Sequence, residues 1–224
     1  MNGRQKYIFD RSDTIRQLKP SDYKNIIFDL GGVILNLDYQ RTIDAFRKLG
    51  IEEFDQSYSQ LNQTNLFDKF ERGEIASSAF RDGLRSVFNE TISDEILDNA
   101  WNAMLLDLPV ERLKALGKLR AERRISLLSN TNEIHVQSFE TALKKAHGLR
   151  NLTGYFDYVY YSCRMGMRKP EPSIFEFVIK DQDYVPAQTV FIDDSLQHIE
   201  GARKVGLNVY HLRADKGETI LDLF

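Results

Sequence analysis

The sequence predicts an α/β protein: a parallel sheet covered by helices on both sides, with a helical insertion after its first strand. Short apolar runs alternate with amphipathic stretches beyond Pro109, which is typical of successive βα units. The stretch before Pro109 shows only helical periodicity after the first strand. We therefore expect three parts: an N-terminal arm over 1–22, a core from 23–38 and 109–224, and an inserted helical cap domain over 39–108.

The first strand is expected over residues 25–28, where "NIIF" precedes Asp29. An unpaired ionised carboxylate out of water costs several kcal/mol. Asp29 therefore either meets solvent at the strand end or is held there for chemistry. Gly31 and Gly32 interrupt the apolar run, and a second extended piece is expected over 33–37.

The insertion is expected to be built from amphipathic helices alone. Ala45, Phe46 and Leu49 recur at helical spacing, and Gly50 is placed to end that helix. Ser93 precedes two acidic residues, which is the pattern of a helix N-cap followed by a favourable first turn.

The rest of the sheet is expected to come from four further strands, over 125–129, 156–161, 189–192 and 207–211. Helices are expected among them at 133–147, 172–180 and 197–205. Apolar, β-branched strands that alternate with helices favour a parallel sheet with both faces covered.

Composition argues against several classes of function. The 224 residues include 30 basic and 33 acidic ones, with a net charge of −3, so no strong field would gather nucleic acid or an anionic membrane. We expect neither partner. The chain begins without the apolar segment of a signal peptide, has no apolar run that could span a bilayer, and contains one cysteine, Cys163. These observations predict a cytoplasmic protein without an intrachain disulfide.

Polar residues stand at or after four of the expected strands. In an open parallel sheet the carboxyl ends of the strands share one rim, where ligands bind. A lone aspartate at a strand end is usually a cap or a turn residue, but several such ends together predict a single site. The residues concerned are Asp29, Ser129, Asn130, Lys169, Asp193 and Asp194.

Phosphoryl transfer is the reaction that these residue types could carry out together. Asp29 can attack phosphorus and form an aspartyl phosphate. Asp193 and Asp194 would repel that phosphate unless a hard cation lay between them, and Mg²⁺ prefers such oxygen ligands. Lys169 supplies a positive charge, and Ser129 a hydroxyl, for the phosphate oxygens. The expected partner is therefore a small phosphorylated metabolite.

Four segments in this order, "FDLGGVIL", "LLSNTN", "GMRKPEPSIF" and "FIDDS", resemble the motifs of the haloacid dehalogenase-like hydrolases. The resemblance covers about residues 24–212. It implies a Rossmann-like core with a small helical cap that closes over the site. Within this superfamily, the segments "FDLGGV", "FERGEI", "LSNTN" and "GMRKPE" are most similar to those of the bacterial α-D-glucose-1-phosphatases and related sugar phosphatases.

The resemblance also implies roles for individual residues. Asp29 would be the nucleophile and a magnesium ligand, and the Gly31 carbonyl a second ligand. Asp194 matches the direct metal ligand, and Asp193 a more remote or water-mediated one. Lys169 would be catalytic as well, because it holds phosphate and nucleophile together. The residues implied to bind phosphate are Ser129, Asn130 and Lys169.

One position departs from the family pattern. Most phosphatases of the superfamily carry a second aspartate two residues after the nucleophile, and this chain has Gly31 there. The aspartate protonates the leaving oxygen, and such help is typically worth ~10²- to 10⁴-fold in rate. Three explanations stay open: a metal-free dehalogenase, an inactive relative that only binds a phosphorylated ligand, or a phosphatase whose substrate leaves easily. An anomeric leaving group, as in α-D-glucose 1-phosphate, favours the third.

A different class of protein is a further alternative. Phosphoacceptor receiver domains gather the same residue types around Mg²⁺ on a parallel sheet, so the chain could be a non-catalytic phosphoacceptor or binding module. A receiver needs no helical insertion, whereas an enzyme uses one as a lid. Within the insertion, the segment 71–74 is expected to be a turn between helices that could reach substrate, and His135 could touch the site.

Overall fold

A five-stranded parallel sheet lies at the centre of the protein, in the order β3-β2-β1-β4-β5. The computed structural model describes residues 19–50, 65–88 and 91–224. The sheet confirms the predicted fold class, and β1 lies in its middle, between β2 and β4. The strands are β1 (Asn25–Phe28), β2 (Arg124–Ser129), β3 (Tyr158–Tyr161), β4 (Thr189–Asp193) and β5 (Asn208–His211).

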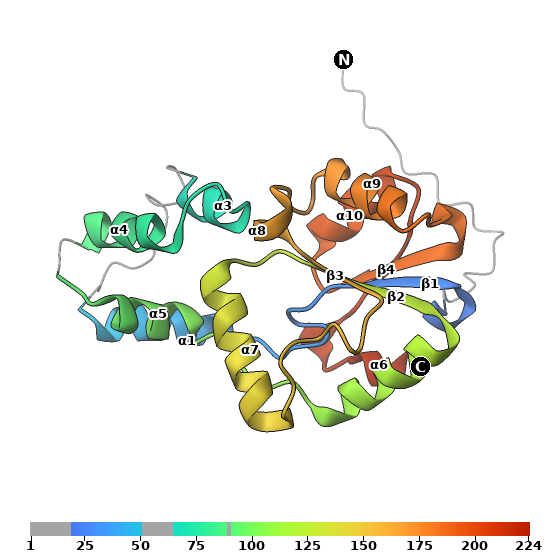
Figure 1. Ribbon diagram of the computed structural model, residues 1–224, viewed down its shortest axis with the longest axis horizontal. Helices are drawn as coiled ribbons and strands as arrows, with labels where there is room; N and C mark the ends of the chain where they lie inside the picture. Colours follow the sequence, from blue (N-terminus) through green and yellow to red (C-terminus); the bar gives the residue numbers. More distant parts are fainter. Residues whose placement is uncertain (1–18, 51–64, 89–90) are drawn as a thin grey trace, which may run out of the picture.

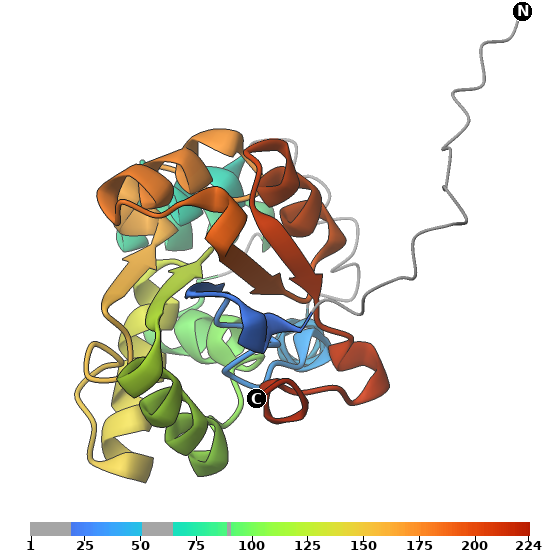
Figure 2. The same ribbon diagram turned by 90° about the vertical axis from the view of Figure 1, so that its right-hand side faces the viewer.

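Helices cover both faces of the sheet, as Figures 1 and 2 show. One face carries α6 (Val110–Glu122) and α7 (Glu133–His147), and the other carries α9 (Pro172–Asp181) and α10 (Leu196–Lys204). Successive side chains of a strand point to opposite faces. Ile26 and Phe28 of β1 therefore join the hydrophobic cluster under α6 and α7, while Ile27 joins the cluster under α9 and α10.

A helical region is inserted between β1 and β2, and it lies beside the sheet rather than on it (Figure 1). Its members, called the inserted helices below, are α1 (Tyr39–Lys48), α3 (Leu66–Glu71), α4 (Ser77–Phe88) and α5 (Asp94–Asn102). They enclose a hydrophobic cluster of their own, in which Phe70 stacks on Phe80 with 4.1 Å between ring centroids. Ser93 caps α5 as predicted, since its side chain accepts a hydrogen bond from the Ile96 N–H.

Two chain segments connect the inserted helices to the sheet, and these segments pair with each other. The Asn36 N–H donates to the Asp107 carbonyl, and the Leu106 N–H donates to the Asn36 carbonyl, both at 3.0 Å. Leu37 and Leu105 form an antiparallel bridge. The chain therefore leaves the sheet and returns to it at one place.

The clearest difference from the predicted elements lies at residues 33–37, which form turns and isolated bridges instead of a strand. The N–H groups of Ile34 and Leu35 both donate to the Leu30 carbonyl at 2.8 Å. Gly32, with φ of 75°, lets the chain fold back in this way. The apolar side chains are buried by this turn, with Val33 and Ile34 fully inaccessible, so their hydrophobicity did not indicate a strand.

Smaller differences concern element ends and short helices. β3 begins at Tyr158, two residues later than predicted, and Pro109 precedes α6 as its N-cap residue. Residues 1–18 of the expected N-terminal arm lie outside the described residues. The short helices are η1 (Pro20–Asp22), α8 (Ser162–Met165), η2 (Pro186–Gln188), η3 (Ala214–Lys216) and η4 (Ile220–Asp222). In the described part of the chain, no helix combines the length and apolar character needed to cross a bilayer.

Candidate active site

Lys169 joins two aspartates at the carboxyl edge of the sheet. Its Nζ donates to Asp29 Oδ1 at 2.6 Å and to Asp193 Oδ2 at 2.7 Å. Lys169 and Asp193 have no exposed surface, and Asp29 is also buried. A charged amine is tolerated in such a place when carboxylates pair with it. Three residues far apart in the sequence thus form one buried ionic unit.

The register of the strands places the two aspartates side by side. Phe28 of β1 is paired with Ile192 of β4, so Asp29 and Asp193 follow at the ends of neighbouring strands. The Asp29 N–H donates to the Ile192 carbonyl at 2.9 Å, which extends the ladder by one residue. The apolar run of β1 therefore delivers its carboxylate to the central position of the rim.

Burial sets the protonation behaviour of this unit. It raises the pKa of Asp29 to about 7; Lys169 opposes the rise, and Asp193 and Asp194 add to it. Burial would lower the pKa of Lys169, but Asp193 and Asp29 outweigh it and the pKa is raised. The pKa of Asp193 is lowered, because Lys169 and His198 outweigh its burial. Of these three groups, Asp29 is therefore the one whose charged form the metal-free protein stabilises least.

An acidic cluster surrounds this position. Asp29, Asp193 and Asp194 offer carboxylate oxygens that all lie within 4.8 Å of one another. Burial and the charge of Asp193 also raise the pKa of Asp194. Carboxylates this close repel one another, and a hard divalent cation that takes oxygen ligands relieves the repulsion. The donor set therefore fits a magnesium ion.

Asp193 and Asp194 differ in how many hydrogen bonds and ion pairs other residues make to their carboxylates. Asp193 Oδ1 accepts a hydrogen bond from the Ser195 N–H at 2.8 Å. His198 Nδ1 lies 3.1 Å and 3.0 Å from the two Asp193 oxygens, and Lys169 holds Oδ2. No described side chain hydrogen-bonds to the carboxylate of Asp194. Asp194 is therefore the freer ligand of the pair.

Gly32 allows the backbone to pass directly against Asp194. Its φ of 75° lies in the left-handed region, and a Cβ built on it would overlap Asp194 Oδ2. Gly31 has no positive φ, and a Cβ there would meet only the end of the flexible Leu37 side chain. Of the two adjacent glycines, Gly32 is the one that this close approach requires.

We expect Gly32→Ala to weaken Mg²⁺ binding by about tenfold or more, equivalent to ~1.4 kcal/mol, because the methyl group displaces the Asp194 carboxylate. Isothermal titration with Mg²⁺ measures the change. Gly217→Ala is the matched control, since Gly217 has φ of 79° but nothing within 4 Å of its Cβ position. Equal Mg²⁺ affinities for wild type and Gly32→Ala would contradict the placement of the ion beside Asp194.

Asn130 fixes the loop that carries Lys169. Its Nδ2 donates to the Lys169 carbonyl, and the Lys169 N–H donates to its Oδ1, both at 2.9 Å. Ser129 is buried, and its hydroxyl makes only a long contact of 3.4 Å with the Asn130 carbonyl. The Ser129 hydroxyl is therefore available to a ligand, whereas the Asn130 side chain already positions Lys169.

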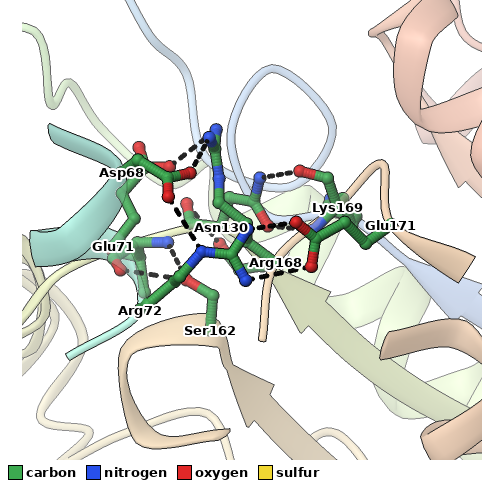
Figure 3. A network of polar contacts seen from close by, with 10 residues as sticks. Asp68, Glu71, Arg72, Asn130, Ser162, Arg168, Lys169 and Glu171 are labelled. Atoms are coloured by element: carbon green, nitrogen blue, oxygen red, sulfur yellow. Dashed lines mark hydrogen bonds and ion pairs between the residues drawn. The ribbon is translucent and has the colours of Figure 1, made fainter. Parts of the chain in front are cut away.

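Ion pairs tie α3 to the same loop (Figure 3). Arg168 Nη1 donates to Asp68 Oδ1 at 2.6 Å, and Arg168 Nη2 lies 2.9 Å from Glu71 Oε2. Arg72 donates to Asp68 at 2.9 Å and forms a two-pronged pair with Glu171. A bidentate pair within such a network fixes geometry better than an isolated surface pair. The inserted helices are thus held next to Lys169.

A cavity of about 520 Å³ lies between the inserted helices and the carboxyl ends of β1 and β2. Gly31, Ser129 and Asn130 line its side nearest the sheet. The rest of the wall is mainly apolar and aromatic, with few polar groups, which is typical of a small-molecule site. The titratable residues that line it are Tyr39, Glu71 and His135.

His135 reaches this cavity in a neutral state. Burial lowers its pKa to about 3. Its Nδ1 lies 2.8 Å from Asn102 Oδ1, and its ring stacks on Trp101 with 5.0 Å between centroids. With Asn102 Oδ1 as acceptor, the single proton of the neutral ring lies on Nδ1. His135 is therefore a fixed hydrogen-bond acceptor rather than a source of protons at neutral pH.

Comparison with known proteins identifies the family. Residues 23–206 match the model of the family described as haloacid dehalogenase-like hydrolase. The chain belongs to this family. The match confirms the predicted superfamily and the prediction that the chain is a hydrolase, and the sheet with its inserted helices agrees with both.

Individual haloacid dehalogenase-like proteins are similar over most of the chain. A D-ribitol-5-phosphate phosphatase of Bacteroides thetaiotaomicron is 32% identical over 187 residues, which are 84% of this chain and 90% of that protein. The crystal structure of a family enzyme from the same organism, in complex with magnesium and inorganic phosphate, is 39% identical with a TM-score of 0.76, over 86% and 95% of the chains. A HAD-like hydrolase structure from Porphyromonas gingivalis is 30% identical with a TM-score of 0.75, over 84% and 90%.

Several residues at this haloacid dehalogenase-like site were not identified from the sequence. His198 belongs to no metal-ligand spacing in the sequence, yet its Nδ1 lies 3.0 Å from Asp193 Oδ2. Its place in the first turn of the helix after the acidic pair was a usable signal. Arg168, beside the predicted Lys169, and Trp101 of α5 gave no such signal, because their contacts depend on how the inserted helices sit against the core.

Proposed function

We propose that the protein is a magnesium-dependent phosphatase that hydrolyses phosphomonoesters through an aspartyl phosphate on Asp29. The observation that carries the proposal is the buried Lys169, which holds Asp29 and Asp193 next to Asp194. Two comparisons support it: a phosphatase 32% identical to this chain, and a family structure that contains magnesium and phosphate.

Each residue then has a chemical task. Asp29 attacks phosphorus, and Lys169 balances the charge of nucleophile and phosphate oxygens. When bound, Mg²⁺ supplies further positive charge at the phosphate. Its proposed ligands are Asp29, Asp194 and the Gly31 carbonyl, with Asp193 indirect because its oxygens already have protein partners. Phosphate would also contact the Ser129 hydroxyl and the main-chain N–H of Asn130.

We propose a sugar or polyol phosphate as the substrate. The cavity of about 520 Å³ has the size of a small-metabolite site. The sequence motifs favoured α-D-glucose 1-phosphate, whereas the 32% identical relative is named for D-ribitol 5-phosphate. Because that relative matches 84% of the chain, we place acyclic polyol phosphates first and glucose 1-phosphate second. The cytoplasmic location stays a prediction.

The two alternative functions make different use of the same residues. A metal-free dehalogenase has no need for Asp194 beside the Asp29–Asp193 pair, and the acidic cluster therefore argues against it. A phosphoacceptor receiver has no need for the partly enclosed cavity between the inserted helices and the sheet. A module that only binds a phosphorylated ligand would use the same cavity, and turnover separates it from an enzyme.

The test is a phosphate-release screen with the purified protein and Mg²⁺. The panel contains ribitol 5-phosphate, glucose 1-phosphate, glucose 6-phosphate, nucleoside monophosphates and, for chloride release, 2-chloropropionate. We expect turnover of polyol or sugar phosphates that stops without Mg²⁺. Chloride release without metal would establish the dehalogenase instead, and binding of a phosphate mimic without turnover would establish the binding module.

A further inference from the structure

The residue that protonates the leaving group is the open question at this site. Ribitol 5-phosphate and similar esters release a primary alkoxide, which is strongly basic and leaves slowly unless it is protonated. Gly31 stands where the usual acid would be. A proton donor for such substrates therefore has to come from elsewhere in the cavity, and this inference rests on the phosphatase function proposed above.

Three titratable residues line the described cavity wall, and two of them fit the task poorly. Partial burial and then the charges of Asp194 and Asp29 raise the pKa of Tyr39, so it holds its proton firmly at neutral pH. The pKa of His135 is lowered to about 3, so the acidic imidazolium form is absent there. A general acid works best when its pKa lies near the operating pH. Glu71 is the remaining group.

The geometry of Glu71 suits a proton donor. It is the last residue of α3 and reaches the cavity that Gly31 and Ser129 also line. Its Oε2 is inaccessible to solvent, lies 2.9 Å from Arg168 Nη2 in an ion pair, and accepts no hydrogen bond from the described residues. Figure 3 shows Glu71 on α3, facing the loop that carries Arg168 and Lys169. The Glu71 side chain as a whole is 26% exposed, so it remains open to a ligand in the cavity that it lines.

Burial and the surrounding charges together set the direction of the pKa shift of Glu71. Burial raises the pKa of its carboxyl, and the groups that face it modify this rise. Arg168, Lys169 and Arg72 lower the pKa of Glu71, while Asp68 raises it, and the net direction is upward. A carboxyl with a raised pKa can give up a proton in one step and take one in the next.

We propose that Glu71 is the general acid and base of this enzyme, in place of the absent aspartate at position 31. In the first step an Asp29 oxygen bonds to phosphorus, the bond to the leaving oxygen breaks, and that oxygen takes the Glu71 proton to leave as an alcohol. In the second step water bonds to phosphorus and gives a proton to the Glu71 carboxylate. The aspartyl phosphate bond then breaks, which restores Asp29 and releases phosphate.

The test compares Glu71→Gln with wild type on two substrates in the presence of Mg²⁺. Ribitol 5-phosphate needs an acid, and p-nitrophenyl phosphate does not, since its phenolate leaves unaided. We expect kcat/KM to fall ~10²- to 10⁴-fold for ribitol 5-phosphate and to stay nearly unchanged for p-nitrophenyl phosphate. In wild type, kcat/KM for ribitol 5-phosphate should fall as pH rises through the pKa of Glu71, and Glu71→Gln should lack this limb.

Controls separate this role from a structural one. Glu74→Gln makes the same chemical change at an exposed residue three positions away and should behave as wild type. Gly31→Asp in the Glu71→Gln background should restore part of the ribitol 5-phosphate activity, since Gly31 has no positive φ and only the Leu37 side chain has to move.

The outcomes distinguish the two proposals. Equal losses on both substrates would mean that Glu71 only positions Arg168 and its neighbours, and no loss on either would remove it from the mechanism. Both results overturn the acid-base role while the phosphatase stands. A wild-type protein that hydrolyses neither substrate would overturn the phosphatase proposal and the role of Glu71 with it.

Discussion

Replacing Asp29 with asparagine is expected to lower kcat for phosphate release by about 10⁴-fold or more, since no other described group is placed to attack phosphorus. Asparagine keeps the size of the side chain but is not a competent nucleophile. Phosphate release under saturating substrate and Mg²⁺ measures the effect. Asp215→Asn, at an exposed residue that pairs with Arg213 and does not line the cavity, is the matched control and should keep full activity.

The same variant also reports on the ionic unit around Lys169. Burial penalises the charged form of Asp29 and raises its pKa to about 7, so loss of that charge removes an unfavourable contribution at neutral pH. We therefore expect the metal-free Asp29→Asn protein to unfold at a temperature no lower than that of metal-free wild type. Full activity of a clean preparation would exclude Asp29 as the nucleophile, and a large fall in unfolding temperature would contradict the account of its burial.

Removal of the metal is expected to have the second large effect. Chelation by EDTA should stop phosphate release, and added Mg²⁺ should restore it. Asp194→Ala should raise the apparent Kd for Mg²⁺ by about 100-fold, or ~2.7 kcal/mol, because it deletes a charged oxygen ligand. His147→Gln, at a ring whose Nε2 lies 2.9 Å from the Leu108 carbonyl, should leave the Kd unchanged.

Two results would count against the magnesium site. Activity that survives exhaustive chelation would favour the metal-free dehalogenase. An Asp194→Ala protein with the affinity of wild type would mean that Asp193, despite its bonds to Lys169 and His198, is the direct ligand. Titration calorimetry on both aspartate variants, Asp193→Ala and Asp194→Ala, separates these cases.

The central part of the site was predictable because strand order and burial determine it. The runs before Asp29 and Asp193 are so apolar that both had to be buried strands, and parallel strands end at a shared rim. Lys169 could be assigned to the same rim from its place after a third strand. The structure brings these three residues within hydrogen-bonding distance, although the sequence alone did not indicate how completely they are buried.

The remaining features depend on contacts between distant segments. Residues 33–37 have the composition of a strand, but the chain turns back at Gly32 and buries them without sheet pairing. Glu71 belongs to a segment predicted as a turn, and it closes α3. Its importance arises from Arg168, almost a hundred residues later, and no periodic pattern in the sequence reports such a pairing.

The paired segments beneath the inserted helices have a consequence for how this protein can diversify. Asn36 is hydrogen-bonded to Leu106 and Asp107, so the ends of the insertion are fixed next to each other whatever lies between them. The cost of closing a loop rises only slowly with its length. A helical segment of a different size could therefore be grafted between Leu37 and Leu105 without stretching the sheet. The cavity wall formed by the inserted helices, which contacts the rest of the substrate, would then change. The wall formed by the sheet edge, which contacts the phosphate group, would stay the same.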